Sequence, residues 1–132
     1  MVNTVTITPI QDGSRDTVVR INIVGDGTGE ETDKVIFDVA SYVNKGVDKK
    51  LVNITYALSG FNARLLWVDA ASPFIPLISL EQEKANQLNF ECEFGGIANT
   101  GVTGRTGNIA MTTLGLGAGD HGYIILTVQS KN

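Results

Sequence analysis

Alternating apolar and polar residues are the dominant pattern along the chain, and a period of two is typical of half-buried β-strands. In residues 17–24, for example, Val19, Ile21 and Ile23 share one face, whereas Arg20 and Asn22 share the other. The run at residues 122–129 is apolar on both faces, which indicates a central strand. The patterns predict about nine strands, at residues 4–10, 17–24, 34–40, 51–58, 62–69, 74–80, 88–94, 107–113 and 122–129.

Helical patterns are rare. Residues 79–88 contain good helix formers but lack a wide apolar stripe, so we expect a long loop there. The chain holds 15 glycines, which suit many tight turns. Short strands separated by turns predict an all-β fold, an antiparallel two-layer β-sandwich that is jelly-roll-like.

The first residues differ from the rest because Pro9 interrupts their strand pattern. Proline is tolerated on an edge strand or in an extended arm, but not in a central strand. We therefore expect residues 1–15 to form a short extended N-terminal arm or edge strand, and residues 16–132 to form a single β-sandwich domain.

Composition narrows the function classes. The chain has 132 residues and a net charge of −4, which argues against nucleic-acid binding. No apolar run approaches a membrane span, and the first residues do not resemble a secretory signal peptide. The single cysteine, Cys92, excludes an intramolecular disulfide framework and alternates with phenylalanines, as a small buried residue would.

The stretch GDGTGEETD, residues 25–33, combines alternating glycines with four carboxylates. A phosphate-binding loop needs a following helix, but a strand pattern follows here. The acids also lack the spacing of an EF-hand. We therefore expect a hairpin between the strands at 17–24 and 34–40, with solvated acids at its tip. A looser calcium site made from these carboxylates is the alternative.

No catalytic constellation is found. His121 is the only histidine and lies next to Asp120, too close in sequence for that carboxylate to orient it easily in a triad. Glu91 and Glu93 share one strand face, but the aromatic platforms that sugar hydrolases use are missing. We expect no enzyme activity, no cofactor and no resident metal.

One segment is unusually apolar. Residues 69–80 contain two prolines and several large apolar side chains, so the segment is either an edge strand folded into the core or a contact surface for another chain. Together with the N-terminal arm it supplies the candidate partner contacts, which are Val5, Ile7, Pro9, Phe74, Ile75 and Leu77.

Three stretches, residues 17–38, 56–80 and 94–132, resemble the capsid cement (decoration) proteins of tailed bacteriophages, including cyanophages. The most recognisable part is Ser-Gly-Phe-x-x-Arg-Leu-x-Trp, from Ser59 to Trp67. The resemblance covers most of the chain from Asp16 onward.

The resemblance implies a virion protein that is made in the host bacterial cytoplasm and added to the capsid exterior. Such a protein would form a homotrimer and bridge neighbouring subunits of the major capsid protein. It would have no catalytic residues. The alternative is a tail or fibre module that binds host surface glycans, which exposed Trp and Tyr beside Asp or Asn would favour.

Overall fold

A computed structural model describes residues 3–13, 16–27, 30–42, 49–69, 75–80, 85–89, 97–98 and 105–130. Apart from one 3₁₀ turn, η1 (Val39–Ser41), all regular elements in these ranges are strands, so the all-β prediction is confirmed. The strands are β1 (Thr4–Asp12), β2 (Asp16–Val24), β3 (Lys34–Phe37), β4 (Lys49–Ser59), β5 (Asn62–Asp69), β6 (Ile75–Leu80), β7 (Ala85–Asn89), β8 (Ile97–Ala98), β9 (Arg105–Leu114) and β10 (His121–Ser130). No helix in the described ranges is long and apolar enough to cross a membrane.

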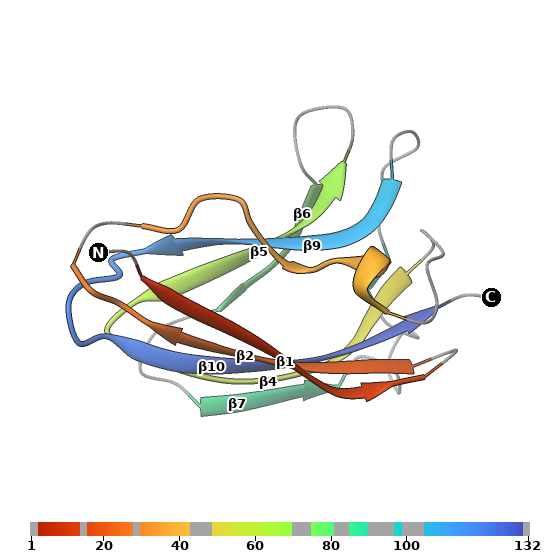
Figure 1. Cartoon of the computed structure of the whole chain (residues 1–132), viewed down its shortest axis with the longest axis horizontal. Coiled ribbons are helices and arrows are strands. Elements are labelled where there is room, and N and C mark those ends of the chain that lie inside the picture. The colour runs from red at the N-terminus through yellow and green to blue at the C-terminus, as the bar shows by residue number, and fades with distance from the viewer. Residues whose placement is uncertain are drawn as a thin grey trace.

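The strands form two antiparallel sheets that lie as two layers (Figure 1). The six-stranded sheet has the order β1-β2-β10-β4-β7, with β8 also pairing with β4, and the four-stranded sheet has the order β3-β9-β5-β6. As predicted, the strand that is apolar on both faces, β10, is central, because it pairs with β2 on one side and β4 on the other.

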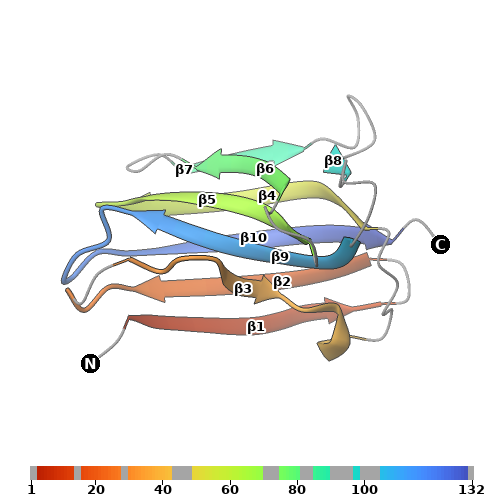
Figure 2. The ribbon, with the colours of Figure 1, turned by 90° about the horizontal axis from the view of Figure 1, so that it is seen from above.

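Leaving aside β1 and β8, the sheet orders are β2-β10-β4-β7 and β3-β9-β5-β6. The chain changes sheet at almost every connection, so strands far apart in sequence become neighbours, as Figure 2 shows for β9 lying between β3 and β5. This is the strand arrangement of a jelly roll, and the predicted jelly-roll-like sandwich is confirmed.

The core lies between the two layers and is built from the faces that the alternation predicted. Val19, Ile21 and Ile23 of β2 are completely buried, whereas Arg20 between them is exposed. Other fully buried side chains are Ile54, Leu65, Trp67, Ile109, Met111, Ile124 and Leu126. Removing one large aliphatic side chain from such a core typically costs about 2–5 kcal/mol.

Two strand predictions need correction. Residues 79–88 are not a long loop, because β6 continues to Leu80 and β7 begins at Ala85. The strand expected at residues 34–40 ends at Phe37, where Asp38 accepts a hydrogen bond from the Ala40 N–H at 3.1 Å and caps the 3₁₀ turn. Of the strand expected at 88–94, residues 90–94 lie outside the described ranges.

The expected hairpin at residues 25–33 is also wrong. β2 pairs with β1 and β10 in one sheet, whereas β3 pairs with β9 in the other. The connecting stretch therefore crosses from one layer to the other. Period-two alternation identifies a strand but not the sheet to which it belongs, so the change of sheet could not be predicted from the pattern.

Residues 4–12 form an edge strand, not a free arm. β1 pairs with β2 from Thr4↔Val24 to Asp12↔Thr17, and the register shifts between Pro9 and Gln11. Val5, Ile7 and Pro9 oppose Ile23, Ile21 and Val19, so they lie on the core-facing side of the sheet.

Candidate functional site

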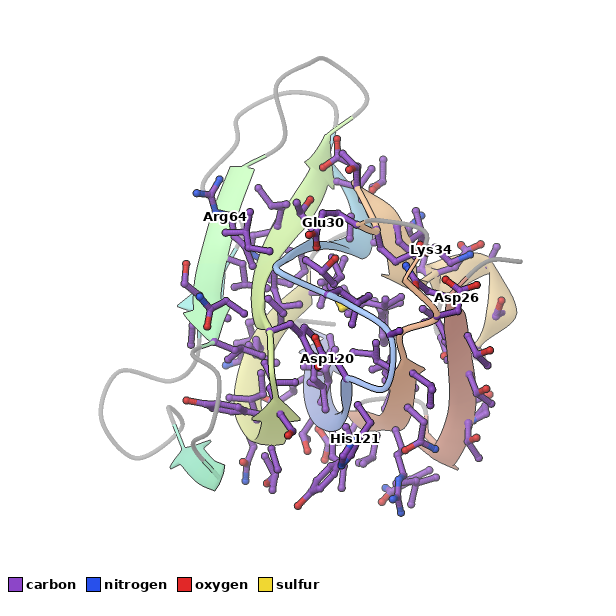
Figure 3. All side chains as sticks on the ribbon, turned by 90° about the vertical axis from the view of Figure 1, so that its left-hand side faces the viewer. Asp26, Glu30, Lys34, Arg64, Asp120 and His121 are labelled. Atoms are coloured by element: carbon purple, nitrogen blue, oxygen red, sulfur yellow. The ribbon has the colours of Figure 1, made fainter. Side chains whose placement is uncertain are left out.

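The acidic crossover, which we define as residues 25–33, is held by hydrogen bonds to the β9–β10 connection. The Glu30 carboxylate accepts from the Thr113 hydroxyl at 2.8 Å, the Gly115 N–H at 2.8 Å and the Leu116 N–H at 3.1 Å. Figure 3 looks onto this end of the sandwich, where Glu30 points inward from the crossover. The acids were expected to be solvated at a hairpin tip, but Glu30 instead links the crossover to β9 and the loop after it.

This arrangement also sets the charge state of Glu30. Burial raises the pKa of the Glu30 carboxyl, but the hydrogen bonds from Leu116, Thr113 and Gly115 outweigh it, so the net pKa is lower than its ordinary value. Hydrogen bonds to the charged form favour that form. Glu30 therefore acts as a charged acceptor for loop amides.

Backbone contacts tie the start of the crossover to the same connection. The Gly25 N–H donates to the Asp120 carbonyl at 2.8 Å, and the Gly119 N–H donates to the Gly25 carbonyl at 3.1 Å. A Cβ at Gly25 would collide with the Gly117 carbonyl oxygen and approach Leu116 Cδ1 to 2.9 Å. The sequence needs glycine here because the two loops touch.

Two further side chains, Asn3 and Thr113, hydrogen-bond to the crossover. The Asn3 side chain accepts from the Asp26 N–H at 3.0 Å and donates to Glu31 at 3.2 Å. The Thr113 hydroxyl also accepts from the Glu31 N–H at 2.9 Å. Within the described residues, no three His, Cys, Asp or Glu side chains are grouped so that they could hold a metal ion.

His121 and the paired glutamates were weighed as catalytic groups. His121 is exposed at the start of β10, with Nδ1 3.2 Å from the Gly119 carbonyl oxygen. The Asp120 carboxylate accepts a hydrogen bond from the Gly117 N–H at 2.8 Å. It therefore stabilises the loop before β10, and among the described residues no hydrogen bond from it to His121 is found. Glu91, Cys92 and Glu93 lie outside the described residues.

The candidate contact residues fall in two places. Val5, Ile7 and Pro9 lie together on β1, where Val5 packs against the core, Ile7 is 37% exposed and Pro9 is exposed. Leu77 lies on β6, an edge strand of the other sheet, and packs against the core. Figure 2 shows β1 and β6 at opposite sides of the sandwich, so these residues do not form one continuous surface. Ile75 begins β6, and Phe74 lies outside the described residues.

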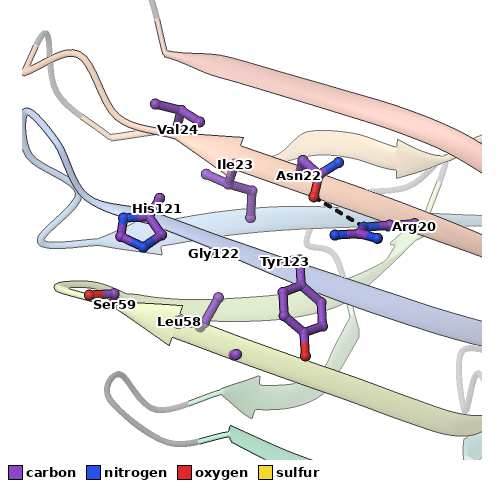
Figure 4. Close-up of a pocket in the computed structure, with 10 residues that line it drawn as sticks. Arg20, Asn22, Ile23, Val24, Leu58, Ser59, His121, Gly122 and Tyr123 are labelled. Atoms are coloured by element: carbon purple, nitrogen blue, oxygen red, sulfur yellow. Dashed lines mark hydrogen bonds between the residues drawn. The ribbon is translucent and has the colours of Figure 1, made fainter.

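A concave region of about 570 Å³ lies on the outer face of the six-stranded sheet. We call it the sheet groove (Figure 4). Its ten lining residues come from β2, β10 and β4 and are Arg20, Asn22, Ile23, Val24, Ala57, Leu58, Ser59, His121, Gly122 and Tyr123. Its volume lies within the range of small-molecule sites.

Cross-strand register explains how these residues meet. Tyr123 of β10 opposes Asn22 of β2 on one side and Ala57 of β4 on the other. His121 likewise opposes Val24 and Ser59. Residues directly opposite on one sheet face lie close enough for their side chains to act together.

Arg20 is held in a defined position beside the groove. Its Nε donates to Asn22 Oδ1 at 3.2 Å, and its guanidinium carbon lies 5.3 Å from the centre of the Tyr123 ring. This distance is within cation–π range. None of the ten lining residues is Asp or Glu, although the chain carries a net charge of −4.

Sequence reasoning missed the sheet groove. The alternation placed Arg20 and Asn22 on the polar face of one strand, but β2 and β10 are about a hundred residues apart in a chain whose fold brings them together. The one usable indication was the expectation of exposed Trp and Tyr beside Asp or Asn in a glycan site. Trp67 does not fit it because it is buried in the core, and Tyr123, which lies opposite Asn22, is half-buried.

The fold and these surface features define a jelly-roll β-sandwich with β1 at one edge of the described six-stranded sheet and a groove on its outer face, where β2 and β4 end and β10 begins. Comparison with protein-family models gives no match, and comparison with curated proteins gives none either.

Proposed function

We propose that this chain is a structural virion protein, a capsid cement protein that binds the outer capsid surface and bridges major capsid protein subunits. Three features support the proposal: the sequence resemblance, the acidic net charge of −4 and the jelly-roll fold, which is used by viral capsid domains. The proposal includes a homotrimer at the three-fold positions of the shell.

The observation that carries the proposal is the edge position of β1, which among the described strands pairs with β2 alone and is called here the free edge. Edge strands of soluble proteins are usually protected by charges, prolines, register breaks or short length. The half of β1 from Thr4 to Thr8 has none of these, and its register with β2 is regular. Its residues are threonines alternating with Val5 and Ile7, all favourable in a strand.

In the described sheets the strands at the other edges are shorter and carry such a feature along their length, whereas β1 carries its proline and its register shift only beyond Thr8. β3 carries Lys34 and a register shift between Val35 and Phe37. β6 carries Pro76 and a register shift opposite Leu65 and Leu66. β7 is only five residues long. A partner strand is therefore best accepted at β1, where backbone hydrogen bonds would join the two chains.

Strand addition at β1 would give a cement function by mass action. A ligand that binds only the assembled shell stabilises that shell relative to its free subunits. Ile7, 37% exposed, and Ile10, 57% exposed, would lose water in the same contact.

The experiment that tests the proposal is the copy number of this protein in purified virions, measured relative to the major capsid protein. Shell decoration must follow shell geometry, so we expect a ratio near one. A few copies per particle would place the protein in the tail or neck. Absence from virions would overturn any virion role.

A second candidate function, glycan binding by a tail or fibre module, is favoured by the sheet groove. Tyr123 lies beside Asn22 there, on an exposed face of a jelly roll, a fold also found in lectins. A low copy number together with saccharide binding would favour this function over cementing.

A further inference from the structure

We propose that the sheet groove is a binding site for a carboxylate-bearing saccharide, with Arg20 as the group that binds the carboxylate. The inference deepens the second candidate function and rests on it. It does not depend on the capsid role, because the groove and the free edge of β1 are different surfaces of the sheet.

Charge selects an anionic ligand. Arg20 is the only permanently charged residue among the ten that line the groove, and no carboxylate lies among them to neutralise it. In the described part of the chain, Arg20 makes one hydrogen bond, through Nε to Asn22. Its two terminal nitrogens therefore remain as donors, and that fork matches the geometry of a carboxylate.

Neighbouring side chains hold the Arg20 guanidinium in place before a ligand binds. The Tyr123 ring, 5.3 Å from the guanidinium carbon, and the Asn22 side chain, 3.2 Å from Nε, hold Arg20 against the sheet. A side chain held in this way loses less conformational entropy on binding than a free arginine.

The remaining polar groups suit hydroxyls. Because Asn22 Oδ1 accepts from Arg20, the Asn22 amide N–H groups point elsewhere and can donate. His121 Nδ1 lies 3.2 Å from the Gly119 carbonyl oxygen, so the other ring nitrogen, Nε2, is not used in that contact and can bond a hydroxyl. Ser59, exposed opposite His121, adds a hydroxyl.

Apolar surface between these groups suits the carbon face of a sugar ring. Ala57 lies opposite Tyr123 on β4, and Val24, 49% exposed, lies opposite His121 on β2. Aromatic and small apolar surfaces with a few placed polar groups are typical of small-ligand sites.

The location favours a saccharide over an acidic peptide. The groove lies over β2, β10 and β4; β2 and β10 are paired on both sides along it, and β4 is paired there with β10 and, as far as Ala57, with β7. Their backbone N–H and C=O groups are therefore used within the sheet, and a peptide backbone would find no partner strand there. A saccharide needs only the side-chain groups already described.

The test is calorimetric titration of the full chain with trigalacturonate, and in parallel with galactotriose, which has the same ring scaffold without carboxylates. We expect trigalacturonate to bind at least about tenfold more tightly than galactotriose, and Arg20→Gln to remove that difference. Arg64→Gln is the matched control, since Arg64 is exposed on β5 in the opposite sheet and its loss changes the net charge equally.

Four outcomes would overturn the proposal. Equal affinity for both sugars would show that the groove binds glycans but does not recognise their carboxylates. Equal losses in Arg20→Gln and Arg64→Gln would show attraction to net charge only. Tighter binding of a glutamate tripeptide than of trigalacturonate would identify a peptide site. No binding of either sugar at millimolar concentration would remove the site, whatever the virion copy number.

Discussion

The acidic crossover and the β1 edge differ in two respects: how strongly the sequence suggests a binding site, and whether the polar groups are already hydrogen-bonded within the chain. The crossover, residues 25–33, is rich in glycine and carboxylates and looks like a ligand site, yet its Glu30 carboxylate is occupied by three donors of the chain itself. Residues Thr4 to Thr8 of β1 look unremarkable, yet they form the free edge of a six-stranded sheet.

The difference shows how a residue's chemistry and its availability are separate properties. Carboxylates that accept backbone N–H groups are already paired, and they stabilise a loop. An edge strand has no special side chains, but its unpaired backbone groups can bind a partner strand. Substitutions in the two regions should accordingly change different quantities.

The largest effect is expected from Gly25→Ala in the crossover. The added Cβ would collide with the Gly117 carbonyl oxygen, a backbone atom that cannot move without its loop. We expect a loss of about 3 kcal/mol in the free energy of unfolding, measured by urea denaturation. Gly117→Ala is the control, because its Cβ would meet Asp120 Oδ2 at an ordinary 3.5 Å and should cost no more than about 0.5 kcal/mol. Equal losses in the two variants would contradict a specific contact at Gly25.

A smaller loss is expected from Glu30→Gln. An uncharged amide accepts hydrogen bonds more weakly than a carboxylate, and its NH₂ group faces donors, so we expect about 1–2 kcal/mol after allowing for the exposure of the residue. Thr113→Val removes the hydroxyl that bonds Glu30 at 2.8 Å. A double-mutant cycle should give a coupling of about 1 kcal/mol, whereas simple additivity would mean that the contact contributes nothing.

The stabilising effect of Glu30 should also depend on pH. The pKa of its carboxyl is lower in the folded chain than the ordinary value of 4.5, so the folded state binds the proton less tightly than the unfolded state. The stabilisation is therefore complete above pH 4.5 and is lost as the pH falls through the folded pKa. We expect the difference in stability between wild type and Glu30→Gln to be constant near neutral pH and to shrink in acid. A difference that grows in acid would show that the hydrogen bonds do not favour the charged form.

Much of the fold could be predicted because burial in a strand is a local property. The buried face of β2 was assigned correctly from alternation alone. β7 was missed because its sequence, ANQLN, has no apolar alternation. Its pairing with β4 from Asn53↔Asn89 to Ala57↔Ala85 overrides that weak local preference.

The candidate sites could not be predicted to the same extent because they depend on pairing. Tyr123 and Asn22 become neighbours only through the β10–β2 register, and the carboxylate of Glu30 finds its donors across the β9–β10 connection. Neither contact leaves a local pattern. The apolar residues of β1 were recognised as candidates, but the regular register from Thr4 to Thr8 becomes visible only through the pairing with β2 and stands out only beside the register shifts of β3 and β6.

The smallest effect on stability, and the sharpest test of the comparison, is expected from Thr6→Lys at the centre of the free edge. Thr6 is exposed, so the free energy of unfolding should change by no more than about 0.5 kcal/mol. A lysine on an edge strand opposes the addition of another strand, so the same change should lower the amount of protein bound per capsid several-fold. Ser79→Lys on β6 is the matched control, because Ser79 is also exposed but its strand already contains Pro76. Capsids lacking the protein, mixed with each variant and separated by sedimentation, would give the occupancy. Equal occupancy for Thr6→Lys and Ser79→Lys would mean that β1 does not receive a capsid strand.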